Sequence, residues 1–299
     1  MKLKHFAVLA FSFLAGAGFA QDLPPVKADV KQMHVYMPQS WAVRQGALIS
    51  NKLNAYEVIL AMTKTNGKTP AQTGIRIWAG DYGFCPLVHS FTMVVDGISI
   101  KKLNVKPSDV SPWKDGKNTG IKIALDFGGS KFDVIFYMRP DSPVLWGMVK
   151  PAENTLKEPK KISLTFTCIP SMLARKNKIP VWAGPEYARE IKTNLKTYPA
   201  NAKVYPLDKA DTEFTFRDAK FDGSAKDKSK GQGPVWLQVD QTETIKGKVR
   251  SVNEWTNWIQ LDLNPKMKEF KFALWQQKAI ISNADFENKL KAEKAAFTR

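Results

Sequence analysis

Residues 120–139 read GIKIALDFGGSKFDVIFYMR, and this stretch decides the fold class. On each side of Gly128-Gly129, apolar residues alternate with polar ones, which is the period of a half-buried β-strand. A pair of glycines between two such runs is typical of a tight β-hairpin. The stretch therefore predicts two antiparallel strands, over 120–127 and 132–139, joined by a two-residue turn.

Short apolar runs cut by Gly, Pro, Asn and Asp continue along most of the chain. Asp96-Gly97 marks a second hairpin turn. Further strands are predicted over 56–62, 74–78, 90–95, 98–103, 144–149, 161–169, 212–217, 235–239, 244–252, 258–263 and 269–275. Strands joined by turns instead of helices favour an antiparallel β-sandwich over a parallel α/β sheet.

Two helices are expected within this mainly β chain. Pro185 and Glu186 predict a short internal helix over 185–196, because proline and an acidic residue both favour a first turn. Ser282 and Asp285 have the spacing of a capping box and predict a C-terminal helix.

The composition of the sequence changes near Pro170, where a basic stretch and a proline-rich aromatic stretch follow the strand-like runs. We expect a leader over 1–20, an N-terminal β-sandwich part over 21–172 and a C-terminal β-rich part over 173–299. Both one large sandwich and two packed modules fit this pattern, and we favour the single sandwich.

The first 20 residues have the pattern of a secretory signal peptide. Lys2 and Lys4 precede an apolar run over 6–17, and Gly18-Phe19-Ala20 fits a cleavage site. The run is too short to span a bilayer, and Gln21 stands where a lipid-anchored protein would have cysteine. We therefore expect a secreted or periplasmic protein with no transmembrane span and no lipid anchor.

The net charge of +17 indicates polyanionic partners. Basic residues are densest over 157–161, 175–178 and 226–230. Outside the cytoplasm, acidic or sulfated polysaccharide, anionic lipid and lipopolysaccharide are better candidates than nucleic acid. In that oxidising setting Cys85 and Cys168 are expected to form a disulfide, the alternative being two separate buried thiols.

Signatures of catalysis are mostly absent from the sequence. It has no close-set His and Cys ligands, G-x-S-x-G, Walker loop or G-x-G-x-x-G, so no metal and no cofactor are predicted. Asp81 and Glu186 follow similar aromatic–small–glycine frames and are candidate carboxylates of a glycoside hydrolase or lyase. The alternative is an acid in a turn and an acid in the first turn of a helix. The sequence leaves the question of enzymatic activity open and favours a protein without catalysis.

Eight of the nine tryptophans divide into two groups by their surroundings, and Trp41 is left unassigned. Those in strand-like runs are expected in the core, and they are Trp78, Trp146, Trp236 and Trp275. Those beside loop residues are expected to bind sugar, together with Lys114 and Lys178, and they are Trp113, Trp182, Trp255 and Trp258. A flat ring covers the apolar face of a pyranose while nearby polar groups bond its hydroxyls. The alternative is that these rings fold back over the ends of the sandwich.

Two resemblances bear on the fold. The segments 125–129, 143–149 and 161–167 resemble strands of galactose-mutarotase-like sandwiches, which accompany secreted bacterial carbohydrate-active proteins. Segments 231–237 and 268–275 are similar to uncharacterised secreted bacterial proteins of that architecture. No motif matches the catalytic acids and histidines of mutarotases, so the resemblance implies a fold and a carbohydrate setting only. Segments 245–252 and 258–263 are similar to the first hairpin of OB-fold barrels, which ranks second because too little chain remains for a fifth strand.

Together these patterns predict a secreted or periplasmic β-sandwich that binds an anionic glycan without catalysis of its own. A glycoside hydrolase or lyase using Asp81 or Glu186 is one alternative, and a structural envelope protein is another.

Overall fold

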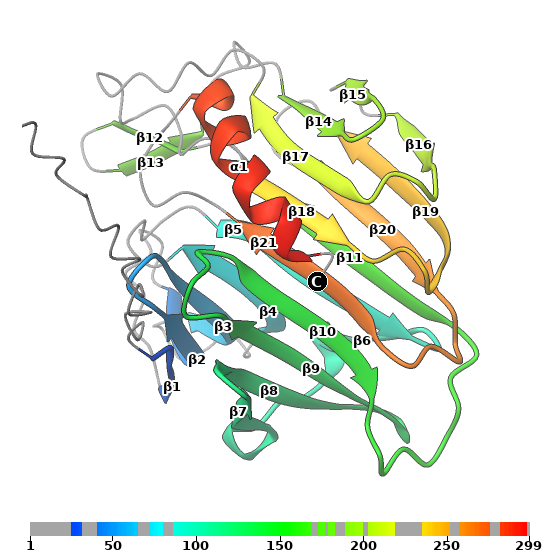
Figure 1. Ribbon diagram of the computed structural model, residues 1–299. Coiled ribbons are helices and arrows are strands. Elements are labelled where there is room, and N and C mark those ends of the chain that lie inside the picture. The colour runs from blue at the N-terminus through cyan, green and yellow to red at the C-terminus, as the bar shows by residue number, and fades with distance from the viewer. Residues whose placement is uncertain are drawn as a thin grey trace, which may run out of the picture.

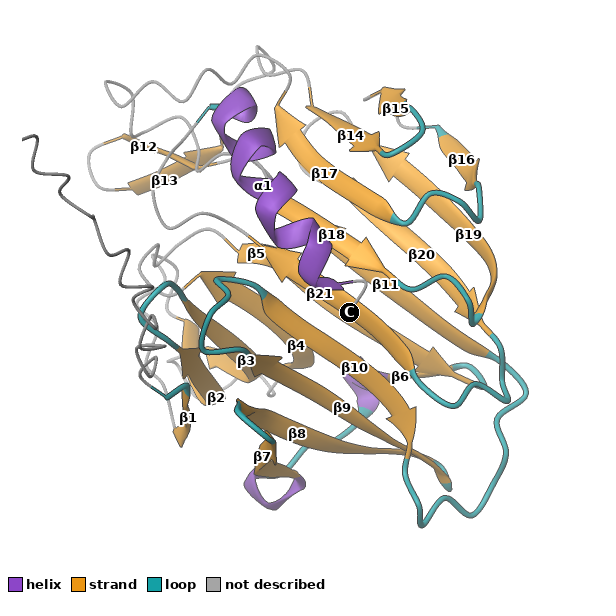
Figure 2. Cartoon of the chain, viewed as in Figure 1, coloured by secondary structure: helices purple, strands orange, loops and turns teal. Residues whose placement is uncertain are grey.

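The protein is described by a computed structural model, which places part of the 299-residue chain. The described residues are 25–31, 41–64, 72–79, 86–168, 173–176, 179–182, 189–199, 203–218, 235–251, 257–275 and 282–297. They form two large antiparallel β-sheets packed face to face, with one α-helix near the C-terminus (Figures 1 and 2). The prediction of a mainly β sandwich is confirmed.

The first sheet has ten strands. In order across the sheet they are β1 (Lys27–Lys31), β2 (Trp41–Ser50), β3 (Ala55–Lys64), β4 (Gln72–Ala79), β5 (Pro86–Val95), β11 (Ile162–Cys168), β20 (Asn257–Leu263), β19 (Thr244–Ser251) and β16 (Val204–Leu207), with β6 (Ile98–Ser99) paired to β5.

The second sheet has nine strands. In order they are β15 (Thr197–Pro199), β14 (Arg189–Thr193), β17 (Glu213–Asp218), β18 (Val235–Val239), β21 (Phe270–Trp275), β10 (Leu145–Pro151), β9 (Ser130–Met138), β8 (Asn118–Phe127) and β7 (Val110–Asp115). The smaller elements are β12 (Leu173–Lys176) paired with β13 (Ile179–Trp182), the 3-10 turns η1 (Ile100–Lys102) and η2 (Pro107–Asp109), and the helix α1 (Asn283–Phe297).

Aromatic side chains fill the centre of the space between the sheets. The Phe272 ring lies 5.0 Å from Phe166 and 5.6 Å from Phe91, both on the ten-stranded sheet, measured between ring centroids. It also lies 5.9 Å from Phe136 in its own sheet. All four rings are fully buried, so they belong to one continuous core that both sheets share.

Both halves of the chain contribute strands to both sheets. In the ten-stranded sheet β11 pairs with β5 on one side and β20 on the other. In the nine-stranded sheet β21 pairs with β10 and β18. Strands from before and after residue 172 are therefore neighbours in the middle of each sheet.

The two predicted hairpin turns are present, one in each sheet. Asp96 and Gly97 join β5 to β6 with φ angles of 48° and 83°, and Gly128 and Gly129 join β8 to β9 with φ angles of 72° and 99°. Positive φ at both central residues matches the right-handed twist of the flanking strands.

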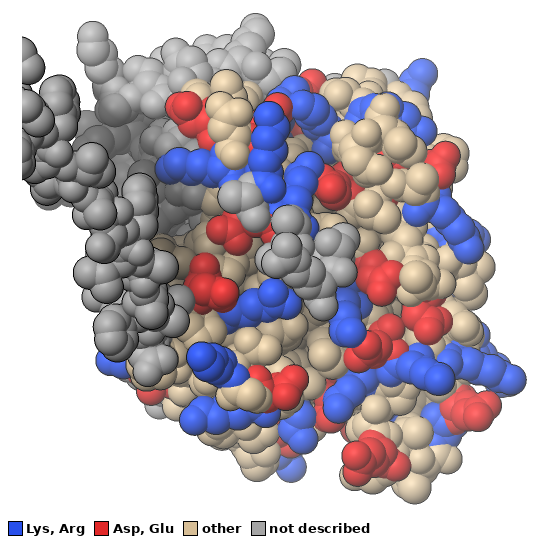
Figure 3. Space-filling view, viewed as in Figure 1, with Lys and Arg blue, Asp and Glu red and all other residues tan. Residues whose placement is uncertain are grey.

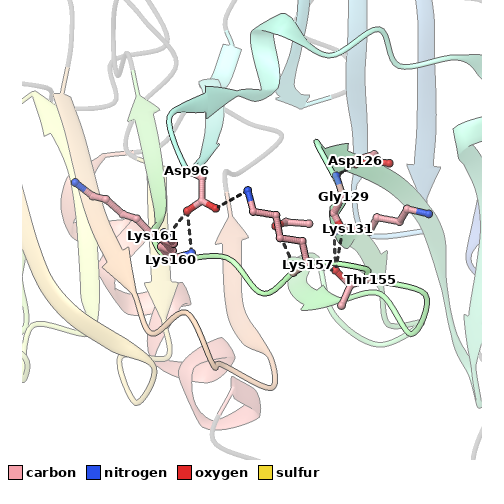
Figure 4. A network of polar contacts seen from close by, with 9 residues as sticks. Asp96, Asp126, Gly129, Lys131, Thr155, Lys157, Lys160 and Lys161 are labelled. Carbon is pink, nitrogen blue, oxygen red and sulfur yellow. Dashed lines mark hydrogen bonds and ion pairs between the residues drawn. The ribbon is translucent and has the colours of Figure 1, made fainter.

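The connection from β10 to β11, residues 152–161, ties these two turns together (Figure 4). At one end the Asp96 Oδ1 atom accepts hydrogen bonds from the backbone N–H groups of Lys160 (2.8 Å) and Lys161 (2.9 Å). At the other end the Gly129 carbonyl accepts from the N–H groups of Leu156 (3.0 Å) and Lys157 (3.2 Å). We call this segment the β10–β11 clamp, because it joins a turn of one sheet to a turn of the other.

The helix α1 covers part of the outward face of the nine-stranded sheet (Figure 1). It begins as predicted: the Ser282 Oγ atom accepts from the Asp285 N–H at 3.0 Å and donates to the Asp285 carboxylate at 2.8 Å. Phe286 and Leu290 are buried against a second, smaller apolar cluster on this face. That cluster contains Trp146, Trp236 and Trp275, so these predicted core tryptophans are buried beneath α1 and not between the sheets.

Three sequence predictions need correction. The internal helix over 185–196 is wrong where the structure describes it, because Arg189–Thr193 is strand β14. Ile191 points into the core while Glu190 and Lys192 point outward, so alternation and pairing with β17 override the helical start signal. The strand over 98–103 ends at Ser99, whose side chain accepts from the Lys101 N–H at 3.3 Å and starts η1. The hairpin of β19 and β20 lies within the ten-stranded sheet and not in an OB-fold barrel.

Candidate functional site

The predicted sugar-binding tryptophans that the structure describes lie in strands and not in loops. Trp113 is in β7, Trp182 in β13 and Trp258 in β20. Pro112 and Pro180 beside the first two suggested loops, but β7 is an edge strand and β13 belongs to a two-stranded ribbon, where proline is tolerated. The other predicted residues, Trp255, Lys178, Asp81, Glu186 and Cys85, lie outside the described residues.

The structure does not bring Trp113 and Trp258 together on one surface. Trp113 is half-buried on the nine-stranded sheet. Trp258 alternates with the core residues Ile259 and Leu261, so it points outward from the ten-stranded sheet on the opposite side of the sandwich. Lys114, next to Trp113 in the same strand, points to the other face of β7 and is exposed.

Trp113 instead contacts an aromatic residue that the sequence reasoning did not single out. Its ring centroid lies 5.0 Å from that of Tyr137, although β8 runs between their two strands. The position in β8 that is paired with both residues is Gly120. A Cβ atom there would lie 1.9 Å from the Phe136 carbonyl oxygen and 2.7 Å from the Tyr137 Cβ atom. Glycine therefore allows the close approach of β9, and the two rings meet above it.

The row of rings continues one strand further, to Trp146. Tyr137 is paired with Trp146 of β10, and their ring centroids lie 6.4 Å apart with planes inclined by 20°. The Arg139 guanidinium lies 4.2 Å from the centre of the Trp146 ring, in cation–π contact. We call Trp113, Tyr137 and Trp146 the aromatic row. It runs across the strands on the outward face of the nine-stranded sheet.

Two open hollows adjoin the aromatic row, one on each side of the contact between Trp113 and Tyr137. The β7 hollow, about 710 Å³, is lined by Trp113 and by the outward residues Lys122, Asp133 and Lys150. The β18 hollow, about 750 Å³, is lined by Tyr137, Trp146, Arg139, Gln238, Asp240 and Lys271. Each hollow has the size of a small-molecule site and combines aromatic with charged side chains.

Charged groups of both signs surround these hollows. Figure 3 shows this face of the molecule, where lysine and arginine side chains are interspersed with acidic ones. Partial burial raises the pKa of Tyr137, while the positive charges of Arg139 and Lys271 act in the opposite direction. The hydrogen bond to Glu269 raises the pKa of Lys271, so its ammonium group stays charged. The β18 hollow thus presents a phenol and two cationic side chains, Arg139 and Lys271, of which Lys271 is also ion-paired with Glu269.

The sequence could have indicated Tyr137 and Arg139 through the alternation in β9. Phe132, Val134 and Phe136 belong to the core, so residues 133, 135, 137 and 139 must point outward. What it could not indicate is that β7 lies at the edge beyond β8 and brings Trp113 to Tyr137. That neighbourhood depends on the hairpin at Gly116 and on the missing side chain at Gly120.

The remaining chemistry of the described residues is sparse. Among them no group of three or more His, Cys, Asp and Glu side chains is arranged to hold a metal ion. Cys168 is buried at the end of β11, and its disulfide with Cys85 stays a prediction. Within the described part of the chain, no helix has the length and apolar character to cross a membrane.

Comparison with known proteins gives distant structural similarity only. No family model and no curated protein matches the chain. Among solved structures it is similar to an α-N-acetylgalactosaminidase from Bifidobacterium bifidum, with a TM-score of 0.46 and 7% identity over 82% of this chain and 38% of that chain. It is also similar to an α-galactosidase from Lactobacillus brevis, with a TM-score of 0.37 and 10% identity over 83% of this chain and 40% of that one. The chain spans about two fifths of the length of these proteins.

Proposed function

We propose that this protein binds an acidic glycan on the outward face of its nine-stranded sheet, and that it does so without catalysis of its own. The observation that carries the proposal is the contact between Trp113 and Tyr137, which stands between two open hollows lined by cationic side chains. The binding surface consists of Trp113 and Tyr137, with Arg139 and Lys271 on one side and Lys122 and Lys150 on the other. Trp146 is buried and packs against Tyr137.

An acidic sugar has two features that this surface can bind, the apolar face of its ring and its negative charge. A partly exposed aromatic ring offers a flat apolar surface to the C–H face of a pyranose. The guanidinium of Arg139 and the ammonium of Lys271 suit a carboxylate or sulfate on the same or the next sugar. Aromatic and cationic groups are within one hollow here, so one sugar unit can contact both.

The setting we propose is outside the cytoplasm, secreted or periplasmic. Its support is the sequence pattern of residues 1–20, which has the basic head, apolar run and small-residue site of a signal peptide. In such a compartment, acidic polysaccharide is one of the polyanions that a basic protein attracts.

The test is a glycan array of neutral, uronic and sulfated oligosaccharides, followed by titration calorimetry on the best ligand. Trp113→Ala is expected to weaken binding about tenfold or more, as for a central aromatic contact. Trp258→Ala is the matched control, since Trp258 is also half-buried but points outward from the other sheet. Binding should also weaken between low and moderate salt, because exposed charges are screened.

Two results would refute the proposal. The first is no binding to any neutral or acidic glycan. The second is an equal loss of affinity in Trp113→Ala and Trp258→Ala. This result would show that the glycan does not bind specifically at the aromatic row.

A further inference from the structure

Gln238 lines the β18 hollow and has a buried side-chain oxygen without a hydrogen-bond partner among the described residues. It is in β18, paired with Ala273 of β21, which is paired in turn with Trp146. Gln238 is 6% exposed, and its Oε1 atom has no hydrogen-bond partner in the part of the chain that the structure describes. A buried polar atom without a partner is costly, and folded proteins contain few of them.

No polar neighbour of Gln238 bonds its Oε1 atom, although the buried Trp236 N–H, two residues earlier in β18, also has no partner in the described part of the chain. Glu213, directly across from Gln238 on β17, forms an ion pair with Lys294 of α1. Asp240, the residue that follows the end of β18, accepts a hydrogen bond from the Thr242 N–H at 3.0 Å. Ala273 has no polar side chain. Most buried glutamines have a protein partner, whereas the Gln238 side chain lines an open hollow that is large enough for a sugar.

The same hollow holds the cations that would receive an acidic group. Arg139 and Lys271 line it together with Gln238 and the Tyr137 ring. Carboxylate and sulfate groups can only accept hydrogen bonds from these cations, so neither can satisfy the free acceptor of Gln238. A ligand that satisfies both must bring a donor, such as a hydroxyl, close to its acidic group.

We propose that Gln238 is a specificity-determining residue, which accepts a hydrogen bond from a sugar hydroxyl while Arg139 and Lys271 hold the acidic group of the ligand. The ligand class is then a uronide, whose sugar rings keep free hydroxyls beside a carboxylate, in preference to a heavily sulfated polymer. This inference rests on the proposed function, since it assigns the ligand class of the same surface.

The experiment measures binding of a hexagalacturonide and of dextran sulfate to the full chain and to Gln238→Leu, which keeps the size of the side chain. We expect Gln238→Leu to bind the hexagalacturonide about threefold to tenfold more weakly and dextran sulfate within twofold of the unsubstituted protein. Its thermal midpoint should not fall, because the substitution removes an unpaired buried acceptor. Gln260→Leu, on the outward face of the other sheet, is the control and should leave both affinities unchanged.

Three other results would overturn the inference, and each has a different meaning for the proposed function. If Gln238→Leu binds the hexagalacturonide normally while Trp113→Ala binds it weakly, the inference fails and the proposed function stands. If Gln238→Leu loses thermal stability and affinity for both probes together, Gln238 is a structural residue. If the unsubstituted protein does not bind the hexagalacturonide, uronide recognition fails, and the glycan array then decides the proposed function separately.

Discussion

Replacing Asp96 tests the β10–β11 clamp directly. Asp96 stands in the turn of the ten-stranded sheet and receives two backbone N–H groups, from Lys160 and Lys161, on one carboxylate oxygen. Its side chain is 15% exposed, whereas the side chain of Lys157, 3.5 Å away, is 53% exposed. The exposed ion pair is screened by solvent and contributes little. The two backbone donors should therefore carry most of the effect.

The expected size follows from the kind of bond that is lost. Asp96→Asn keeps an acceptor oxygen and tolerates the left-handed φ of 48°, so it removes only the charge. Because charge-assisted hydrogen bonds are about twice as strong as neutral ones, we expect a loss of about 1 kcal/mol in the free energy of unfolding. Asp96→Gly also suits this φ but removes the acceptor, and should cost about 2 kcal/mol.

The effect should depend on pH with a defined sign. Partial burial acts to raise the pKa of Asp96, but the two backbone donors and the Lys157 charge together outweigh it and lower the pKa. A carboxyl whose pKa is lowered by folding stabilises the protein above its unfolded pKa of about 4, and this contribution disappears as the pH falls through the folded value. The difference between the unsubstituted protein and Asp96→Asn should thus be full at pH 7 and shrink below pH 4.

Urea unfolding at a series of pH values is the measurement. Asp133→Asn is the control, because Asp133 has the same 15% exposure but only a 3.9 Å contact with Lys122. It should change stability by less than about 0.5 kcal/mol. Equal midpoints for Asp96→Asn and the unsubstituted protein at pH 7, or a loss that is the same at pH 3, would refute the reasoning.

Two further predictions concern the surface around the aromatic row and the helix above it. Gly120→Ala should destabilise the protein by about 3 kcal/mol in thermal unfolding, because the new Cβ atom would collide with the backbone of β9. Gly74→Ala, where nothing lies within 4 Å, should be nearly neutral, and similar losses in both would contradict the explanation. Glu287→Gln should speed hydrogen exchange in α1 about twofold to fivefold, because Glu287 holds the helix through Lys192 at 2.6 Å and Arg217 at 2.9 Å. Exposed Lys289→Gln is the control for this experiment, and unchanged exchange in Glu287→Gln would show that apolar packing alone anchors α1.

The fold could be predicted where local pattern and long-range packing agree. Residues 120–139 alternate in polarity, and their two-glycine turn requires positive φ, so strand, turn and register all follow from the sequence. Residues 189–193 could not be predicted in this way. The helical start signal, Pro185-Glu186, depends only on nearby residues. The strand forms because Ile191 packs into a core whose other residues are distant in the sequence.

The proposed binding surface shares only part of its residues with the site expected from the sequence. Trp113 belongs to the surface, but Trp258 points away on the other sheet, and Tyr137 and Gln238 were not singled out. Sequence shows that a tryptophan has polar neighbours along the chain. It does not show which strand lies beside that tryptophan. Here the Trp113 ring contacts Tyr137, which lies two strands away in the sheet.

The place of β21 in the nine-stranded sheet has a consequence for how the chain folds. Residues 270–275 lie between β10 and β18, so until they are made the sheet consists of two pieces with open edges. Such unpaired edges are prone to pair with other chains, and contacts between distant residues form slowly. The nine-stranded sheet can therefore not close until residues 270–275 have taken their place between β10 and β18. The protein should depend on chaperones that shield these edges during that interval.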